Sequence, residues 1–217
     1  MILLLTGTHG SGKTTIAEKA SEAFDLPFYK SRASEAYTSR GITFAEAGSL
    51  TIAQRLEIQC DIFGFWAEDY QKATSQGAGI FDRCPIDFAA YTLSEIRSNS
   101  SEPESAAIEA YIESCFDVLR LAANDSTIML VQPHNIEMTD RGSSKPAVSN
   151  SAYSRQIHCL VHGLLLQSGC KFDVMPSADI ASRMDMLTRY INAKFDDAAD
   201  EAAQSNLEYP PFVSKIQ

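Results

Sequence analysis

The segment GTHGSGKTT, which runs from Gly7 to Thr15, follows directly on the apolar run Met1–Leu5. It has the spacing Gly, four residues, Gly, Lys and Thr, between a predicted strand at Ile2–Leu5 and a predicted helix at Thr14–Phe24. The glycines let the backbone curl so that several N–H groups point inward, and the start of the helix adds positive potential. This arrangement binds a chain of phosphates, and it requires a fold in which a strand, a loop and a helix follow one another.

The side chains of this loop have separate roles in binding a nucleoside triphosphate. Lys13 can reach the β- and γ-phosphates, and the hydroxyl of Thr14 can coordinate Mg²⁺. We therefore expect ATP with Mg²⁺ as the phosphate donor. The residues expected to bind it are Gly7, His9, Gly10, Ser11, Gly12, Lys13, Thr14 and Thr15.

The overall charge restricts what else the chain can bind. The sequence of 217 residues carries a formal net charge of −10, whereas a broad nucleic-acid surface relies on clustered lysine and arginine. The five cysteines form no C-x-x-C pair, which indicates reduced thiols in a cytoplasmic protein. No stretch approaches the ~20 apolar residues of a membrane span, so we expect no membrane partner.

Strand and helix patterns alternate along most of the chain. This alternation predicts an α/β fold, with a mostly parallel sheet and helices on both of its faces. Ligands of such folds bind at the carboxyl ends of the strands, where the phosphate loop and Asp82 both fall. The predicted strands are Ile2–Leu5, Pro27–Lys30, Ile80–Asp82, Thr127–Val131 and Cys170–Met175. The predicted helices are Thr14–Phe24, Thr51–Lys72, Pro85–Ile96, Ala106–Ala123, Ala152–Leu166 and Ala178–Phe195, with a polar stretch around Gly41 and Gly48 and a loop at Ser98–Ser105.

These elements predict one domain over residues 1–195 and a tail at 196–217. The segment from Gln132 to Asn150 is polar and contains Pro, Gly and Ser, which is typical of an exposed, mobile segment. The tail begins acidic and rich in alanine and ends with YPPFVSKIQ. Packing on the surface and partial disorder are both open for this tail.

A second constellation lies in GIFDRCPIDFAAY, from Gly79 to Tyr91. Asp82 ends a predicted strand, where it can hold Mg²⁺ through a water or accept a proton from an attacking hydroxyl. Arg83 can clamp a phosphate with two parallel hydrogen bonds. The alternative is a surface ion pair between Asp82 and Arg83, with Asp87 as an ordinary residue of the first helical turn.

Together, GTHGSGKTT and FDRCPIDFAAY resemble the P-loop kinases of nucleosides and nucleotides. The resemblance is greatest to the AAA-type ATPase-like family that includes nicotinamide riboside kinase domains and many phage-encoded nucleotide kinases, and it extends to about Ile191. It implies a five-stranded parallel sheet and a mobile lid after the fourth strand, at about 132–150. The lid sequence DRGSSKP lacks the arginine-rich array typical of such lids, but it contains Arg141, the first candidate for a catalytic lid cation.

The acceptor side is expected along the helix Thr51–Lys72. In related kinases this helix lines the acceptor pocket, where an amide such as Gln59 reads a base and a ring such as Phe63 stacks on it. Core packing of Phe63 is the alternative. Arg32 and Arg40, after the second strand, stand where such kinases bind an acceptor phosphate, although this segment also reads as an ordinary polar loop. Arg83 completes the expected substrate-binding set.

The short chain has no second nucleotide-binding domain and no N-K-x-D run for guanine, which favours a kinase. The predicted reaction moves the γ-phosphate of ATP to a nucleoside monophosphate or a nucleoside, with catalysis by Lys13, Asp82, Arg83 and Arg141. Thr14 and Asp82 are the expected metal ligands. Two alternatives stay open: a phage-type kinase of hydroxymethylated pyrimidine in DNA, and a regulatory or binding NTPase without an acceptor. A viral protein would act in the host cytoplasm, and the sequence leaves open whether it forms a homodimer.

Overall fold

The structure is a computed structural model that describes residues 1–43, 45–95, 100–133, 151–176 and 178–207, with the backbone alone for 196–207. Its centre is a five-stranded sheet in the order β2-β3-β1-β4-β5, and every pairing in it is parallel. The strands are β1 (Ile2–Thr6), β2 (Phe28–Tyr29), β3 (Gly79–Asp82), β4 (Ser126–Val131) and β5 (Asp173–Met175). The predicted α/β fold with a five-stranded parallel sheet is confirmed.

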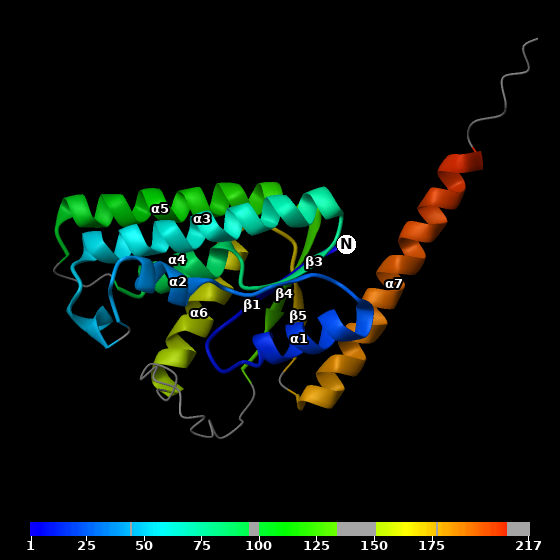
Figure 1. Ribbon diagram of the computed structural model, residues 1–217, viewed down its shortest axis with the longest axis horizontal. Coiled ribbons are helices and arrows are strands. Elements are labelled where there is room, and N and C mark those ends of the chain that lie inside the picture. Colours follow the sequence, from blue (N-terminus) through cyan, green and yellow to red (C-terminus); the bar gives the residue numbers. More distant parts are fainter. Residues whose placement is uncertain (44, 96–99, 134–150, 177, 208–217) are drawn as a thin grey trace, which may run out of the picture.

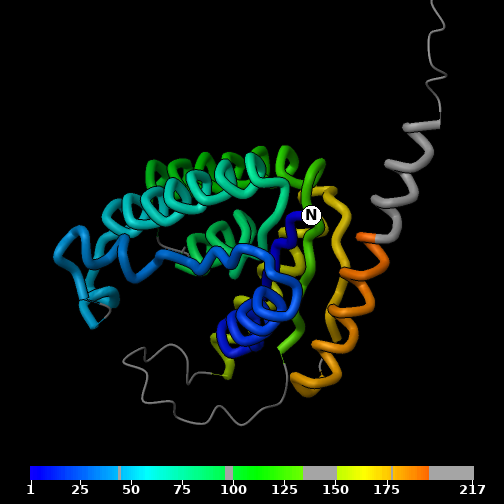
Figure 2. The backbone as a smooth tube through the Cα atoms, turned by 45° about the vertical axis from the view of Figure 1, so that its right-hand side comes forward, coloured from blue at the N-terminus to red at the C-terminus, as the bar shows by residue number. Residues whose placement is uncertain are grey.

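Helices cover both faces of this sheet (Figure 1). They are α1 (Lys13–Phe24), α2 (Ala33–Ser39), α3 (Ile52–Gln76), α4 (Pro85–Leu93), α5 (Glu102–Ala122), α6 (Ser151–Ser168) and α7 (Ile180–Leu207), with a 3-10 turn, η1, at Glu46–Ser49. Helices α3 to α6 pack on one face, whereas α1 and α7 pack against each other on the opposite face (Figure 2). Successive strand residues enter opposite cores, as expected for a sheet buried on both sides: Leu4 and Leu130 enter the first, Leu5 and Val131 the second.

The central strands bring the two sequence motifs to the same edge of the sheet. Leu5 of β1 pairs with Asp82 of β3, so the phosphate loop after β1 and the Asp-Arg pair after β3 begin side by side. Thr6 of β1 pairs with Leu130 of β4, which brings the exit of β4 beside the same loop. The predicted lid begins at this exit, but its residues from 134 to 150, Arg141 included, lie outside the described part of the chain.

Helix α2 was not predicted, because the segment after β2 reads as a polar loop. It spans Ala33–Ser39, and Ala36 is its one buried residue. A helix that buries a single alanine has no apolar periodicity, so its formation depends on packing against α3 and leaves no signal in the sequence.

Several helices are longer than predicted, among them α3, which continues past Lys72 to Gln76. Helix α5 begins at Glu102, inside the predicted loop, because the side chain and backbone N–H of Ser101 form a capping box with Glu104. Helix α7 begins after Asp179, whose carboxylate accepts from the backbone N–H of Ser182, and it continues past Phe195 to Leu207. Its last part is rich in Ala and contains no Gly or Pro, a composition that favours continued helix. No helix in the described ranges combines the length and the apolar character needed to cross a membrane.

Candidate active site

The phosphate loop connects β1 to α1 through a backbone that only glycine adopts readily. Gly7, Gly10 and Gly12 have φ angles of +140°, +71° and +91°, in the region that disfavours residues with a Cβ atom. A Cβ atom on Gly7 would also lie 2.6 Å from the carbonyl oxygen of Val131, the last residue of β4. The loop can therefore fold against the exit of β4 only with glycine at this position.

Lys13 is buried in the loop that it follows. Its Nζ donates hydrogen bonds to the carbonyl oxygens of Gly7 and Thr8, each at 2.7 Å, and lies 3.4 Å from Oγ of Ser11. Burial, followed by the nearby charge of Arg83, lowers the pKa of Lys13 to about 8. The ammonium is thus held inside the loop, at the position from which it can contact a phosphate chain.

Thr14 and Asp82 meet across the two motifs. The Thr14 hydroxyl donates a hydrogen bond to Oδ2 of Asp82, although the two residues lie on α1 and β3 respectively. A hydroxyl and a carboxylate are oxygen ligands of the kind that Mg²⁺ takes in proteins. The pair predicted from the sequence to hold the metal is therefore adjacent and chemically suited to it.

Asp87 connects the phosphate loop to the turn after β3, a role that the sequence analysis missed. Its side chain is fully buried, and its two oxygens accept from the backbone N–H groups of Gly7 (3.1 Å) and Cys84 (2.9 Å). Nη1 of Arg83 lies 3.9 Å from the same carboxylate. The second Asp of Asp-Arg-x-Pro-x-Asp was visible in the sequence, but its contact with Gly7 spans 80 residues and depends on the β1–β3 pairing.

Arg83 has a strained backbone that its neighbours hold in place. Its φ is +102°, which a non-glycine residue rarely adopts. Its N–H donates to the Leu5 carbonyl at 2.9 Å, and its carbonyl accepts from Nε1 of Trp66 at 3.2 Å. Such strain persists where the surrounding structure fixes the residue, and it is common at functional sites.

The Arg83 guanidinium contacts the phosphate loop through His9. Its Nη2 lies 3.2 Å from Nδ1 of His9, and its central carbon lies 4.8 Å from the ring centre of Tyr91. Because arginine can only donate, Nδ1 of His9 is the acceptor. The rings of His9 and Tyr91 also contact each other, with centroids 4.8 Å apart. His9 was expected among the donor-binding residues, and the structure places its ring against Arg83.

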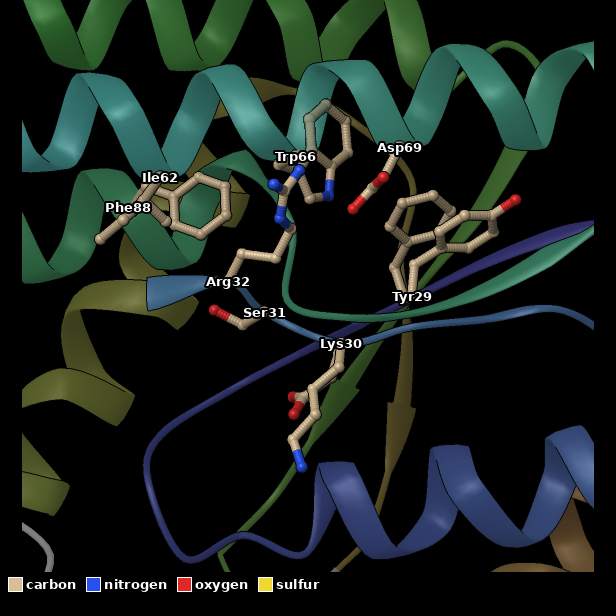
Figure 3. Close-up of a pocket in the computed structure, with 10 residues that line it drawn as sticks. Tyr29, Lys30, Ser31, Arg32, Ile62, Trp66, Asp69 and Phe88 are labelled. Atoms are coloured by element: carbon tan, nitrogen blue, oxygen red, sulfur yellow. The ribbon is translucent and has the colours of Figure 1, made fainter. Parts of the chain in front are cut away.

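A cleft opens beside Asp82, between the end of β2 and helix α3. Figure 3 shows Ile62, Trp66 and Asp69 on α3 above Tyr29 and Arg32, which lie at the end of β2 and after it. The cleft is lined by Tyr29, Lys30, Ser31, Arg32, Ile62, Trp66, Asp69, Phe81, Asp82 and Phe88. Its walls thus combine aromatic rings with two cations and two carboxylates, a mixture suited to a small polar molecule with an apolar face.

Of the predicted acceptor residues, Arg32 lines this cleft. It is paired with Glu35, at 2.5 Å, and with Glu68, at 3.4 Å, and its guanidinium lies 4.0 Å from the ring centre of Phe65. Arg40 lines neither this cleft nor the second one described below, because Glu57 and Asp61 of α3 hold it, each at 2.5 Å.

Phe63 and Gln59 do not line this cleft. The Phe63 ring packs in an aromatic cluster with Trp66, Phe88 and Tyr111, at centroid distances of 6.2 to 6.3 Å. Gln59, one turn earlier on α3, lines a second cleft together with the ion pair between Arg55 and Glu95. Base recognition by Gln59 and Phe63 remains a prediction.

Comparison with known families and curated proteins gives one match. The family model described as "AAA domain" matches residues 3–183 of this chain. No curated protein matches the sequence. The matched range includes the phosphate loop, the Asp-Arg motif and the start of α7.

Solved structures share the fold at low sequence identity. Deoxyadenosine kinase from M. mycoides, bound to dCMP and dCDP, is 17% identical, with 89% of this chain and 100% of that chain covered and a TM-score of 0.63. NadR in complex with NAD and AMP-PNP is 14% identical, with 87% and 49% covered and a TM-score of 0.52. Shikimate kinase from Aquifex aeolicus is 10% identical, with 89% and 98% covered and a TM-score of 0.51. These likenesses confirm the P-loop kinase fold that the sequence predicted.

Proposed function

This chain belongs to the AAA domain family, and we propose that it is a phosphotransferase that moves the γ-phosphate of ATP to a nucleoside or a nucleoside monophosphate. One observation carries the proposal: Asp82 accepts a hydrogen bond from Thr14 and also lines the cleft beside α3. A phosphate chain in the loop and a molecule in the cleft therefore meet at one carboxylate. Direct transfer requires this proximity of donor and acceptor.

The phosphate loop would bind the donor, with its inward N–H groups and Lys13 on the phosphates. Thr14 and Asp82 would hold Mg²⁺, which when bound neutralises charge on the phosphate oxygens. Arg83 would orient the acceptor or the transferring group, because His9 fixes its guanidinium beside the loop. We keep Arg141 as the proposed lid cation. In this scheme the protein contributes positioning and fixed charge more than covalent chemistry.

The charges of the cleft favour a hydroxyl acceptor over a phosphate. Asp69 and Asp82 both line it, and Arg32 already pairs with two carboxylates. A monophosphate would have to displace those carboxylates from Arg32 or use the exposed Lys30. A nucleoside hydroxyl needs only a base, and Asp82, which lines the cleft, would accept its proton as the alternative to its role on Mg²⁺. We therefore propose a nucleoside as the first acceptor and a nucleoside monophosphate as the second.

A screen with labelled ATP tests this proposal. Nucleosides, nucleoside monophosphates and oligonucleotides with hydroxymethylated pyrimidines are incubated with the protein, Mg²⁺ and γ-labelled ATP, and the label is followed into each product. We expect label in a nucleoside. The variant Asp82→Asn should reduce this transfer by roughly 10²–10⁴-fold, the usual contribution of a general base, while Asp117→Asn, on the exposed face of α5, should leave it unchanged.

Three results of the screen would correct the proposal. Transfer to a monophosphate that survives in Asp82→Asn would rule Asp82 out both as the base and as an essential metal ligand, and would identify the monophosphate as the acceptor. Label in the oligonucleotides alone would favour the DNA-modifying alternative. Label in inorganic phosphate alone would favour an NTPase without an acceptor.

A further inference from the structure

Arg183, near the start of α7, is a fully buried arginine behind the phosphate loop. Its Nη1 donates to the carbonyl oxygen of Ser11 at 2.5 Å, and its Nη2 donates to the carbonyl oxygen of Gln132 at 2.6 Å. Ser11 belongs to the phosphate loop, and Gln132 is the first residue after β4. One guanidinium therefore joins the back of the loop to the point where the segment after β4 begins.

The contacts of Arg183 follow from the geometry of the loop. A loop that turns its N–H groups inward, toward phosphates, must turn carbonyl groups outward, and a buried carbonyl needs a donor. Arg183 supplies that donor to Ser11. The C-terminal end of β4 contacts the other end of the loop directly. The carbonyl oxygen of Val131 occupies the space that a Cβ atom on Gly7 would fill. Gly7 at one end of the loop thus lies against Val131, and Ser11 is joined to the next residue, Gln132, through Arg183.

The charge of Arg183 has no ion-pair partner among the described residues, although the nearby carboxylate of Asp179 favours its charged form. No described carboxylate lies within ion-pair distance of its guanidinium, and its Nε has no hydrogen-bond partner there. Burial lowers the pKa of Arg183, although a guanidinium remains charged at neutral pH. A buried cation is normally paired, because removing an ion from water is costly. The two carbonyl groups solvate the charge without neutralising it, so an anion bound at the loop would complete the electrostatic balance.

We propose that Arg183 is a positioning residue for the phosphate donor, which fixes the loop through Ser11 and attracts the polyphosphate through its unpaired charge. This inference rests on the proposed function, because it takes a nucleoside triphosphate as the ligand of the loop. It assigns to α7, far along the chain from the phosphate loop, part of the binding energy for ATP.

The test compares Arg183→Met, which removes both the charge and the fork of donors, with Arg183→Lys, which keeps the charge. Binding of MgATP is measured by calorimetry, and the Michaelis constants of both substrates are measured with the acceptor found in the screen. We expect the Kd for MgATP to rise roughly tenfold or more in Arg183→Met, the scale of a charge-assisted hydrogen bond. Arg183→Lys should recover part of that loss but not all of it. The Michaelis constant of the acceptor should stay unchanged.

Arg189→Met is the matched control, because Arg189 lies on the same helix, is exposed and pairs with Asp185. It should bind MgATP as the unmodified protein does. Equal Kd values for the unmodified protein and a folded Arg183→Met would overturn the inference. If Arg183→Met does not fold, an unchanged Kd in Arg183→Lys overturns it instead. Failure of the unmodified protein to bind MgATP would contradict the proposed function itself, so the two failures are distinguishable.

Discussion

At the scale of single residues, the most informative group is the ammonium of Lys13. Burial lowers its pKa to about 8 in the free protein, and bound phosphates must raise that pKa again because they favour the charged form. Below pH 8 the lysine is already protonated and binding needs no proton. Above pH 8 binding must take up a proton, so affinity for MgATP should fall by up to about tenfold per pH unit.

Calorimetry at pH 9 in two buffers of different ionisation enthalpy measures this proton uptake. We expect a value approaching one proton per MgATP bound. The control is Lys13→Arg, whose guanidinium is charged throughout this range and should show no uptake. Uptake that persists in Lys13→Arg, or that is missing from the unmodified protein, would refute the assignment to Lys13.

Gly7 gives a second prediction at this scale. Gly7→Ala introduces a Cβ atom 2.6 Å from the Val131 carbonyl, on a backbone at φ +140°. We expect a loss of about 1–3 kcal/mol in the free energy of unfolding, together with much weaker MgATP binding. Gly64→Ala is the control: Gly64 is exposed within α3 and its added Cβ atom would meet nothing within 4 Å. That change should stabilise the protein by about 0.5–1 kcal/mol. Urea unfolding measures both, and equal effects would contradict the account.

The residues of the site differ in how far the sequence could predict them. Lys13 and Thr14 follow from contiguous motif spacing, and Asp82 follows from its place at the end of a strand. The structure brings Thr14 and Asp82 together as expected. Arg183 contacts the loop across 172 residues, so no local pattern could reveal it. The sequence could not decide whether Phe63 stacks on a ligand or packs in the core, because either role puts an aromatic residue on the same face of α3. In the structure its ring packs against Phe88 and Tyr111.

At the scale of elements, the connection that matters most is the one between the phosphate loop and α4. The buried carboxylate of Asp87 accepts one N–H from each side, Gly7 in the loop and Cys84 before the helix. In Asp87→Asn, an NH₂ group replaces one of the two carboxylate oxygens. It then faces the backbone N–H of Gly7 or Cys84, so two donors meet without an acceptor. We expect a cost of about 1–3 kcal/mol, the penalty for a buried group left without its partner.

Denaturant unfolding of Asp87→Asn checks this cost, with Asp185→Asn as the matched control. Asp185 lies on an exposed turn of α7 and pairs with Arg189, so its replacement should change stability by less than about 1 kcal/mol. The Michaelis constant for ATP should rise only in Asp87→Asn, because only this change frees the loop from α4. If Asp87→Asn lost stability while its Michaelis constant for ATP stayed unchanged, Asp87 would support only α4 and not the phosphate loop.

The helices and strands also differ in how well the sequence predicted them. Strands β1, β3 and β4 are short apolar runs and were predicted within one or two residues. The start of α5 was missed although Ser101 and Glu104 have capping-box spacing, because the proline between them suggested a loop. Helix α2 was missed for a different reason, since a single buried alanine carries no periodicity.

At the scale of the whole molecule, charge separates a free nucleoside acceptor from DNA. The chain carries a net charge of −10, and the cleft is lined by two cations and two carboxylates. We expect the Michaelis constant of the acceptor to change by less than about threefold between 50 and 200 mM salt. A protein that contacts 6–10 DNA phosphates loses about 10³–10⁵ in affinity over that range. Steady-state kinetics at several salt concentrations make the measurement, and a steep loss would favour the DNA alternative.

The central claim is that the loop and the cleft act together, so that phosphate passes to an acceptor and not to water. The most direct test measures ADP released and acceptor phosphorylated in the same reaction, with and without acceptor. We predict slow ADP release alone, a large increase when the acceptor is added, and one phosphorylated product for each ADP formed. An ADP release that ignores every acceptor and yields only inorganic phosphate would contradict the claim.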